Sequence, residues 1–287
     1  MKKLFCLMTA ALFMTGVIAQ NESKTTKVRW CSYNIRCISS DDDAKGVGWD
    51  SRKERACNWV LDNKIDICGM QEVTPRQMDE VLKALPQYKY VGVGRTDGKR
   101  KGEFTPILYR KDRFIALDQG NFWLSETPDV PGSKGWDAAL ERVASWVKLK
   151  DKKTGQIFMA VNTHFDHRGN KARVESAKLI MKKIQEIVKD KPAAVTGDFN
   201  ITSTSEAYAT MVGSDFVMKD AYAVSPEHHG VHYTFNGYKK VDPAKASKID
   251  FIFITPQIKV NRTCVPQDDL NWVLSDHNPH WADLEFW

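Results

Sequence analysis

Short apolar segments rich in β-branched and aromatic residues recur along the 287-residue chain, and each is long enough for one strand. The loop 151–155, Asp-Lys-Lys-Thr-Gly, joins two alternating segments and is typical of a β-hairpin. Strand-like segments outnumber helix-like ones, which predicts an α/β domain built on layered sheets. The clearest strand segments are 28–35, 65–70, 142–150, 156–163, 193–196 and 248–254.

Two segments carry strong helix signals. Thr74 is placed as an N-cap, with Pro75 at the first helical position and Gln77 completing a capping box. Segment 172–188 has apolar residues on one helical face, namely Ala177, Ile180, Ile184 and Ile187. The chain shows no repeat, no low-complexity tract and no dividing linker, so we expect a single domain over residues 20–287.

The first nineteen residues have the pattern of an export signal. Lys2 and Lys3 precede the apolar run 4–14, and small residues at Val17 and Ala19 fit cleavage after Ala19. The apolar run is short for a membrane span and no stop-transfer sequence follows it. We therefore expect residues 1–19 to be a signal peptide, and the protein to be periplasmic or extracellular, without stable insertion in the membrane.

Charge and cysteine content limit the function only loosely. The formal net charge is +6, two units of which come from Lys2 and Lys3, and this mild excess permits an anionic substrate without requiring one. The cysteines beyond the signal peptide are odd in number and match no zinc pattern. Most lie in apolar segments, so we expect buried free thiols: Cys31, Cys37, Cys57, Cys68 and Cys264.

Residues with carboxylate, amide or imidazole side chains directly follow apolar strand segments at several points of the chain. Strand ends on one edge of layered sheets share a cleft, so these side chains are expected to converge. Asp250 differs, because it interrupts the apolar strand segment itself, and a buried carboxylate is costly unless it is paired. His277 is its natural partner. The strand-end residues are Asn34, Glu72, His164, Asp198, Asn200, Asp276 and His277.

Each of these residues also has a purely structural interpretation. The segment 197–200, Gly-Asp-Phe-Asn, is an ordinary turn sequence, although Asp198 and Asn200 at positions i and i+2 can face one ligand together. Glu72 beside a helix start can simply favour the helix dipole. Taken as a set, carboxylate and amide oxygens suit Mg²⁺ or Mn²⁺, and neighbouring histidines suit acid–base chemistry. Phosphoester hydrolysis needs this mixture.

Seven motifs, in order, resemble the endonuclease/exonuclease/phosphatase family, which has the deoxyribonuclease-like fold. Together they extend over nearly the whole chain, from about residue 28 to residue 286. They are Ser-Tyr-Asn-Ile-Arg (32–36), Gln-Glu-Val (71–73), Ile-Leu-Tyr-Arg (107–110), Asn-Thr-His (162–164), Gly-Asp-Phe-Asn (197–200), Lys-Ile-Asp-Phe-Ile (248–252) and Ser-Asp-His-Asn-Pro (275–279).

The resemblance implies a four-layer sandwich of two mixed β-sheets flanked by helices, with the site at one edge. It implies Glu72 as the main Mg²⁺ or Mn²⁺ ligand, with Asn34 beside it and Asp276 completing the shell. The resemblance also implies that Asp198 positions or deprotonates the attacking water, while Asn200 and His277 contact the phosphoryl group. Asp250 would orient His277, and His164 would protonate the leaving group. Tyr109 and Arg142 match positions that face the cleft.

The sequence differs from one branch of this family at two positions. The apurinic-site repair enzymes of the family carry a carboxylate where this chain has Arg36, and an asparagine where it has His164. The chain therefore looks more like exported bacterial members of the family than like a DNA-repair nuclease.

Several functions remain open from the sequence. The leading one is an exported, divalent-metal-dependent phosphoesterase that hydrolyses a phosphodiester or phosphomonoester with activated water. The substrate is then a small diester, a lipid or sugar phosphate, or a nucleic acid, and an extracellular nuclease acting on DNA or RNA is the alternative. A non-catalytic binding module is a minor alternative, because no expected catalytic position is substituted. No obligate protein partner is evident.

Overall fold

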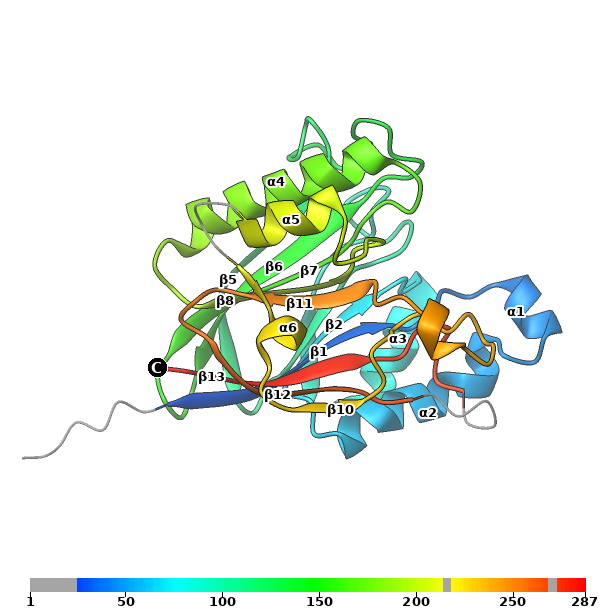
Figure 1. Cartoon of the computed structure of the whole chain (residues 1–287), viewed down its shortest axis with the longest axis horizontal. Coiled ribbons are helices and arrows are strands. Elements are labelled where there is room, and N and C mark those ends of the chain that lie inside the picture. Colours follow the sequence, from blue (N-terminus) through cyan, green and yellow to red (C-terminus); the bar gives the residue numbers. More distant parts are fainter. Residues whose placement is uncertain (1–24, 214–217, 268–272) are drawn as a thin grey trace, which may run out of the picture.

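The computed structural model describes residues 25–213, 218–267 and 273–287, and these form two β-sheets packed face to face with helices outside both (Figure 1). The predicted α/β four-layer sandwich is confirmed. The predicted signal peptide, residues 1–19, lies outside the described residues.

The first sheet has seven strands and mixed direction. β1 pairs in parallel with β2, and β10 with β12, while the other neighbours are antiparallel. In spatial order the strands are β10 (His228–Gly230), β12 (Lys259–Val265), β13 (His280–Phe286), β1 (Thr26–Asn34), β2 (Ile67–Gln71), β4 (Ile107–Arg110) and β3 (Tyr88–Val91).

The second sheet has six strands, and only β7 and β8 pair in parallel. The predicted hairpin is confirmed between β6 and β7, where the Asp151 carboxylate accepts the backbone N–H groups of Lys153 and Thr154 in the turn. In spatial order the strands are β5 (Phe114–Trp123), β6 (Val143–Asp151), β7 (Ile157–His164), β8 (Ala193–Asp198), β11 (Asp250–Ile254) and β9 (Lys219–Asp220).

Helices cover the outer face of each sheet. α4 (Asn170–Val188) and α5 (Glu206–Gly213) lie on the six-stranded sheet, with the predicted apolar face of α4 buried against β7 and β8. α2 (Trp49–Asp62) and α3 (Pro75–Ala84) lie on the seven-stranded sheet, and the capping box at Thr74 is present. The shorter helices are α1 (Ser40–Ala44), α6 (Ala221–Val224) and the 3₁₀ turn Pro243–Lys245.

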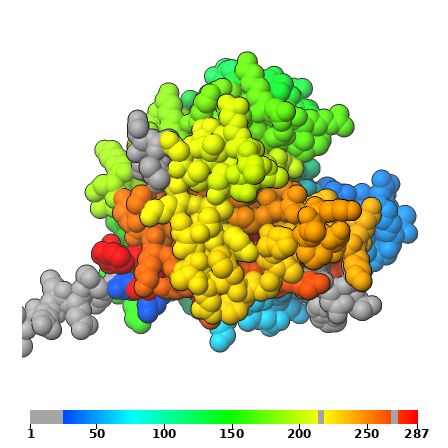
Figure 2. All heavy atoms as spheres, viewed as in Figure 1, coloured from blue at the N-terminus to red at the C-terminus, as the bar shows by residue number. Residues whose placement is uncertain are grey.

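Residues 218–267 close one side of the sandwich. α6 packs against β9 and β11 of one sheet and β12 of the other, so it bridges the two layers. Figure 2 shows these yellow and orange segments as a continuous cover over the face that Figure 1 presents.

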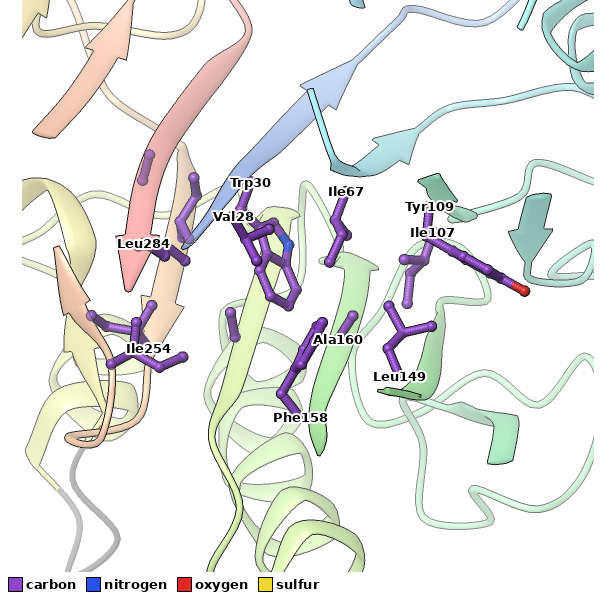
Figure 3. Packing of buried hydrophobic residues seen from close by; sticks show 14 of the residues in the cluster. Val28, Trp30, Ile67, Ile107, Tyr109, Leu149, Phe158, Ala160, Ile254 and Leu284 are labelled. Atoms are coloured by element: carbon purple, nitrogen blue, oxygen red, sulfur yellow. The ribbon is translucent and has the colours of Figure 1, made fainter. Parts of the chain in front are cut away.

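The core between the sheets is a layer of interdigitated apolar side chains (Figure 3). Trp30 of β1 meets Phe158 of β7 edge-to-face, with ring centroids 5.7 Å apart. Burying this layer fixes the two sheets to each other, and therefore fixes the relative positions of their strand ends.

Two further observations bear on the sequence predictions. Among the described residues, none of the helices is both long and apolar enough to cross a bilayer. The cysteines of the described chain are free thiols, and Cys31, Cys57 and Cys68 are buried.

Candidate active site

The strand register brings the predicted residues to one end of both sheets, the end nearest α1 in Figure 1. In the first sheet, Asn34 pairs with Gln71, the residue before Glu72. In the second, Asp198 lies between two neighbours, paired with His164 on β7 and with Asp250 on β11. The residues that meet at this edge are Asn34, Glu72, His164, Asp198, Asn200, Asp250, Asp276 and His277.

Asp198 is the centre of the cluster. Its Oδ2 accepts a hydrogen bond from Asn34 Nδ2 at 3.0 Å and lies 3.5 Å from His164 Nε2 and 3.7 Å from His277 Nε2. Its Oδ1 accepts the backbone N–H of Asn200 at 3.0 Å. Asn200 has a φ of 51°, a left-handed conformation that this hydrogen bond helps to hold.

Asp250 and His277 form a buried ion pair, with Oδ2 and Nδ1 2.8 Å apart. Burial alone would lower the pKa of His277, but the charge and hydrogen bond of Asp250, together with the charge of Asp198, raise it well above its ordinary value. The pairing with Asp250 therefore favours the imidazolium form of His277, whose Nε2 is directed at Asp198.

His164 is in the opposite state. Burial, and then the charge of Arg142, lower its pKa well below the ordinary histidine value. Its Nδ1 is buried and has no hydrogen-bond partner among the described residues. The surroundings thus favour the neutral form of His164 and the charged form of His277, which lie on either side of Asp198. A separation of this kind gives two titratable groups different proton-transfer roles.

Glu72 is held as a carboxylate. Its Oε1 accepts Asn34 Nδ2 at 3.1 Å, and its Oε2 accepts the backbone N–H of Cys37 at 3.0 Å. Burial opposes ionisation, but the Cys37 amide, the charge of His277 and the Asn34 amide hold the pKa of Glu72 below its ordinary value. Its φ of 63° is a strained conformation of the kind found at functional sites.

The donor set fits a divalent cation. Glu72, His164 and Asp198 offer donor atoms within 4.8 Å of one another, as do Asp198, Asp250 and His277. Burial, and then the charge of Asp250, raise the pKa of Asp198 to about 7. Three carboxylates gathered in a buried cluster repel one another, and a cation bound between them would relieve that repulsion.

Asp276 lies at the rim of the cluster, beside Arg36. Arg36 Nε lies 3.8 Å from Asp276 Oδ2, and Arg36 Nη1 lies 3.8 Å from Glu72 Oε2. Burial raises the pKa of Asp276, and the charge of His277 opposes that rise. The described donor groups within 4.8 Å do not include Asp276, so its role as a metal ligand stays a prediction.

Six residues of the cluster line a cleft of about 590 Å³: Glu72, His164, Asp198, Asn200, Asp276 and His277. Arg142, which the resemblance placed at the cleft, lies in its wall. Most of the other lining residues had no recognisable signal in the sequence, because they lie on loops whose path depends on tertiary contacts. Of these, Phe235 packs edge-on against His277, with ring centroids 5.1 Å apart. The unpredicted lining residues include Cys37, Asp42, Lys45, Arg95, Glu103, Leu140, Phe235 and Tyr238.

Tyr109 is not part of this cluster. It pairs with Ile67 at the start of β2, whereas Glu72 follows the end of that strand. Figure 3 shows Tyr109 in the layer between the sheets, beside Ile107 and Leu149. β4 runs antiparallel to β2, so its C-terminal end reaches the edge of the sandwich opposite the cleft.

The chain is similar to known proteins in both sequence and structure. A sequence profile described as the endonuclease/exonuclease/phosphatase family matches residues 31–277, a range that contains every residue of the cluster. The chain belongs to the endonuclease/exonuclease/phosphatase family. Members of this family are generally phosphoester hydrolases.

Solved structures of the family superimpose over nearly the full chain. An endonuclease/exonuclease/phosphatase from Bacteroides vulgatus is 49% identical, with a TM-score of 0.89, covering 91% of this chain and 100% of that one. A mannosyl-6-phosphatase from Bacteroides thetaiotaomicron is 41% identical, with a TM-score of 0.83, covering 90% and 99%. The human Nocturnin catalytic domain, with bound sulfate, is 18% identical with a TM-score of 0.71 (93% and 97% covered), a likeness of fold.

Proposed function

We propose that this chain is an exported, divalent-metal-dependent phosphoesterase that hydrolyses its substrate with an activated water. One observation carries the proposal: Asp198 lies within 4 Å of a neutral histidine and a charged one, in a carboxylate cluster suited to a cation. Glu72 and Asn34 would hold Mg²⁺ or Mn²⁺, with Asp276 at the rim. When bound, the ion neutralises charge that develops on the phosphoryl group.

The chain's own groups perform the remaining steps. Asp198 orients the attacking water and accepts its proton, because its raised pKa of about 7 makes it a better base than an ordinary aspartate. The His277 imidazolium donates from Nε2 to a phosphoryl oxygen, and Asp250 keeps its Nδ1 protonated. Asn200 donates one amide N–H to the Phe165 carbonyl and keeps the other for the phosphate.

His164 acts on the leaving group. It is neutral in the free protein, so it must gain a proton when the anionic substrate arrives and adds negative charge beside it. It then gives that proton to the departing oxygen.

A phosphorylated sugar is the substrate class that we favour. The 41% identical relative over 90% of this chain is a mannosyl-6-phosphatase. The cleft wall also contains both cations (Arg36, Arg95, Arg142) and acids (Glu72, Glu103, Asp276), whereas a polymer's phosphate backbone needs a continuous basic track.

Hydrolysis of mannose 6-phosphate, p-nitrophenyl phosphate, bis-p-nitrophenyl phosphate and DNA, each with Mg²⁺ or Mn²⁺, tests the proposal. We expect turnover of a small ester and loss of it in Asp198→Asn with folding retained. Turnover of DNA alone would make the chain a nuclease. Binding without turnover of any ester would make it a non-catalytic module.

Export is part of the proposal and has a separate test. Expression of the full chain in a bacterial host, followed by fractionation and N-terminal sequencing, is expected to yield a product that begins at Gln20 outside the cytoplasm. A cytoplasmic product that keeps Lys2 and Lys3 would contradict it.

A further inference from the structure

Arg142 is a buried arginine whose guanidinium is only partly satisfied. Its side chain is 5% exposed, and Nη2 lies 3.2 Å from His167 Nδ1, but Nε and Nη1 have no hydrogen-bond partner among the described residues. Asp166 Oδ2 is 3.6 Å from Nε, and the Asp166 oxygens already accept three backbone N–H groups. Buried donors without acceptors are costly, so this side chain is poised for an acceptor that a ligand supplies.

Arg95 is a second guanidinium in the wall of the same cleft. Its backbone is fixed by Trp123, whose Nε1 donates to the Arg95 carbonyl at 2.6 Å. Its side chain is 13% exposed and is positioned by Glu103, with Nη1 and Oε2 2.7 Å apart. The charge of Arg95 helps to lower the pKa of both Arg142 and His164, so the three side chains face one region.

We propose that Arg95 and Arg142 form a two-arginine clamp that binds a terminal phosphate dianion, so that the enzyme prefers phosphomonoesters to phosphodiesters. This inference rests on the proposed function, since it concerns which ester enters the site.

Phosphodiesters and phosphomonoesters differ in their charge and in their number of non-bridging oxygens. A phosphodiester has two non-bridging oxygens and one negative charge, and the metal site with the His277 imidazolium provides for these. A terminal phosphate has a third non-bridging oxygen and, above its second pKa, a second charge. Arg142 offers two nitrogens without an acceptor, Nε and Nη1, and Arg95 adds a second cation in the same cleft wall. Guanidinium groups bind phosphate oxygens in a forked geometry that a single ammonium cannot match.

Glu103 and Asp166 form the ion pairs with the two arginines, and neither replaces the ligand. Glu103 pairs with one end of Arg95, and Asp166 is occupied by backbone donors, so the free N–H groups of Arg142 remain unbonded in the protein alone. A diester would also have to place its second ester group against the charged side chains of Glu103 and Asp166.

The test compares p-nitrophenyl phosphate with bis-p-nitrophenyl phosphate on the metal-loaded full chain. We expect the wild type to favour the monoester. Arg95→Met should lower kcat/KM for the monoester by roughly 10²-fold while changing the diester less than about threefold. Isothermal titration of inorganic phosphate at pH 8 should show binding that is weakened at least tenfold in the variant.

Two variants keep the result interpretable. Arg100→Met removes an exposed arginine of the same loop, which pairs with Asp79, and should leave both rates unchanged. Arg95→Lys keeps a cation beside Glu103 but loses the fork, and should retain folding with a partial loss of monoester preference. Equal losses on both esters in Arg95→Met, or a wild type that prefers the diester, would overturn the clamp but leave the phosphoesterase intact. No turnover of either ester would overturn both.

Discussion

Asp250 Oδ2 accepts a hydrogen bond from His277 Nδ1 at 2.8 Å, and the two residues come from different sheets of the sandwich. Asp250 opens β11 in the six-stranded sheet, and His277 precedes β13 in the seven-stranded one. The pair therefore joins the two layers at the floor of the cleft. Asp250 Oδ1 has no partner among the described residues, so this carboxylate is committed to His277.

Replacing Asp250 by Asn should inactivate the enzyme without unfolding it. The amide has nearly the shape of the carboxylate but no charge, so the pKa of His277 falls and the imidazolium is lost at neutral pH. We expect kcat to fall on the order of 10²–10⁴-fold. NMR of the metal-free protein should show His277 doubly protonated at pH 7 in the wild type and neutral in the variant. A variant with normal kcat and neutral His277 would show that the charge is dispensable.

Metal binding should stabilise the protein through Glu72. A ligand at 100 times its Kd adds about 2.7 kcal/mol to the free energy of unfolding, which raises Tm on the order of 5–10 °C for a chain of this size. We expect Mg²⁺ or Mn²⁺ to produce this shift, EDTA to abolish activity, and Glu72→Gln to lose both effects. Glu103→Gln is the matched control for the Tm shift, which it should retain, because Glu103 is another cleft carboxylate outside the donor groups. If the metal raised the Tm of Glu72→Gln as much as that of the wild type, the metal site would have to lie elsewhere.

Asp166 should contribute to stability in a pH-dependent way. Burial opposes its ionisation, but the backbone N–H groups of Gly169 and Arg168 hold its pKa well below the ordinary value of 3.8. A depressed carboxyl pKa stabilises the fold above the unfolded-state value, and this contribution is lost as the pH falls towards the folded-state value. Asp166→Asn should therefore cost about 2 kcal/mol at pH 7 by urea unfolding, and progressively less below about pH 4. A pH-independent difference would show that the carboxylate charge does not matter.

The strand-end residues were predictable because their positions follow from local geometry and sheet topology. Asp198 ends β8 with Asn200 two residues beyond it, and Glu72 directly follows β2, so any pairing that brings the parallel strands together also brings these residues together. Asp250 was predictable for another reason, namely that a carboxylate inside an apolar strand requires a partner. The partner, His277, was found at the expected place.

The loop residues were not predictable in the same way. Arg95 and Phe235 reach the cleft because the path of their loops is fixed by contacts with distant segments, such as the hydrogen bond from Trp123 to the Arg95 carbonyl and the isolated bridge between Phe235 and His277. Nothing in the local pattern encodes those contacts. Tyr109 is the opposite case. Its motif led us to expect it at the cleft, but the antiparallel direction of β4 places it towards the other end of β2.

Tyr109→Phe should accordingly leave catalysis unchanged. Tyr109 pairs with Ile67, and about five residues of extended chain separate that position from Glu72, which is roughly 16 Å along the strand. Its ring contributes to the core between the sheets, and phenylalanine preserves that packing. We expect kcat/KM within twofold of the wild type and little change in Tm, whereas Arg142→Met should lower kcat/KM strongly. A large loss in Tyr109→Phe alone would mean that the hydroxyl acts on the site from the opposite edge of the sandwich.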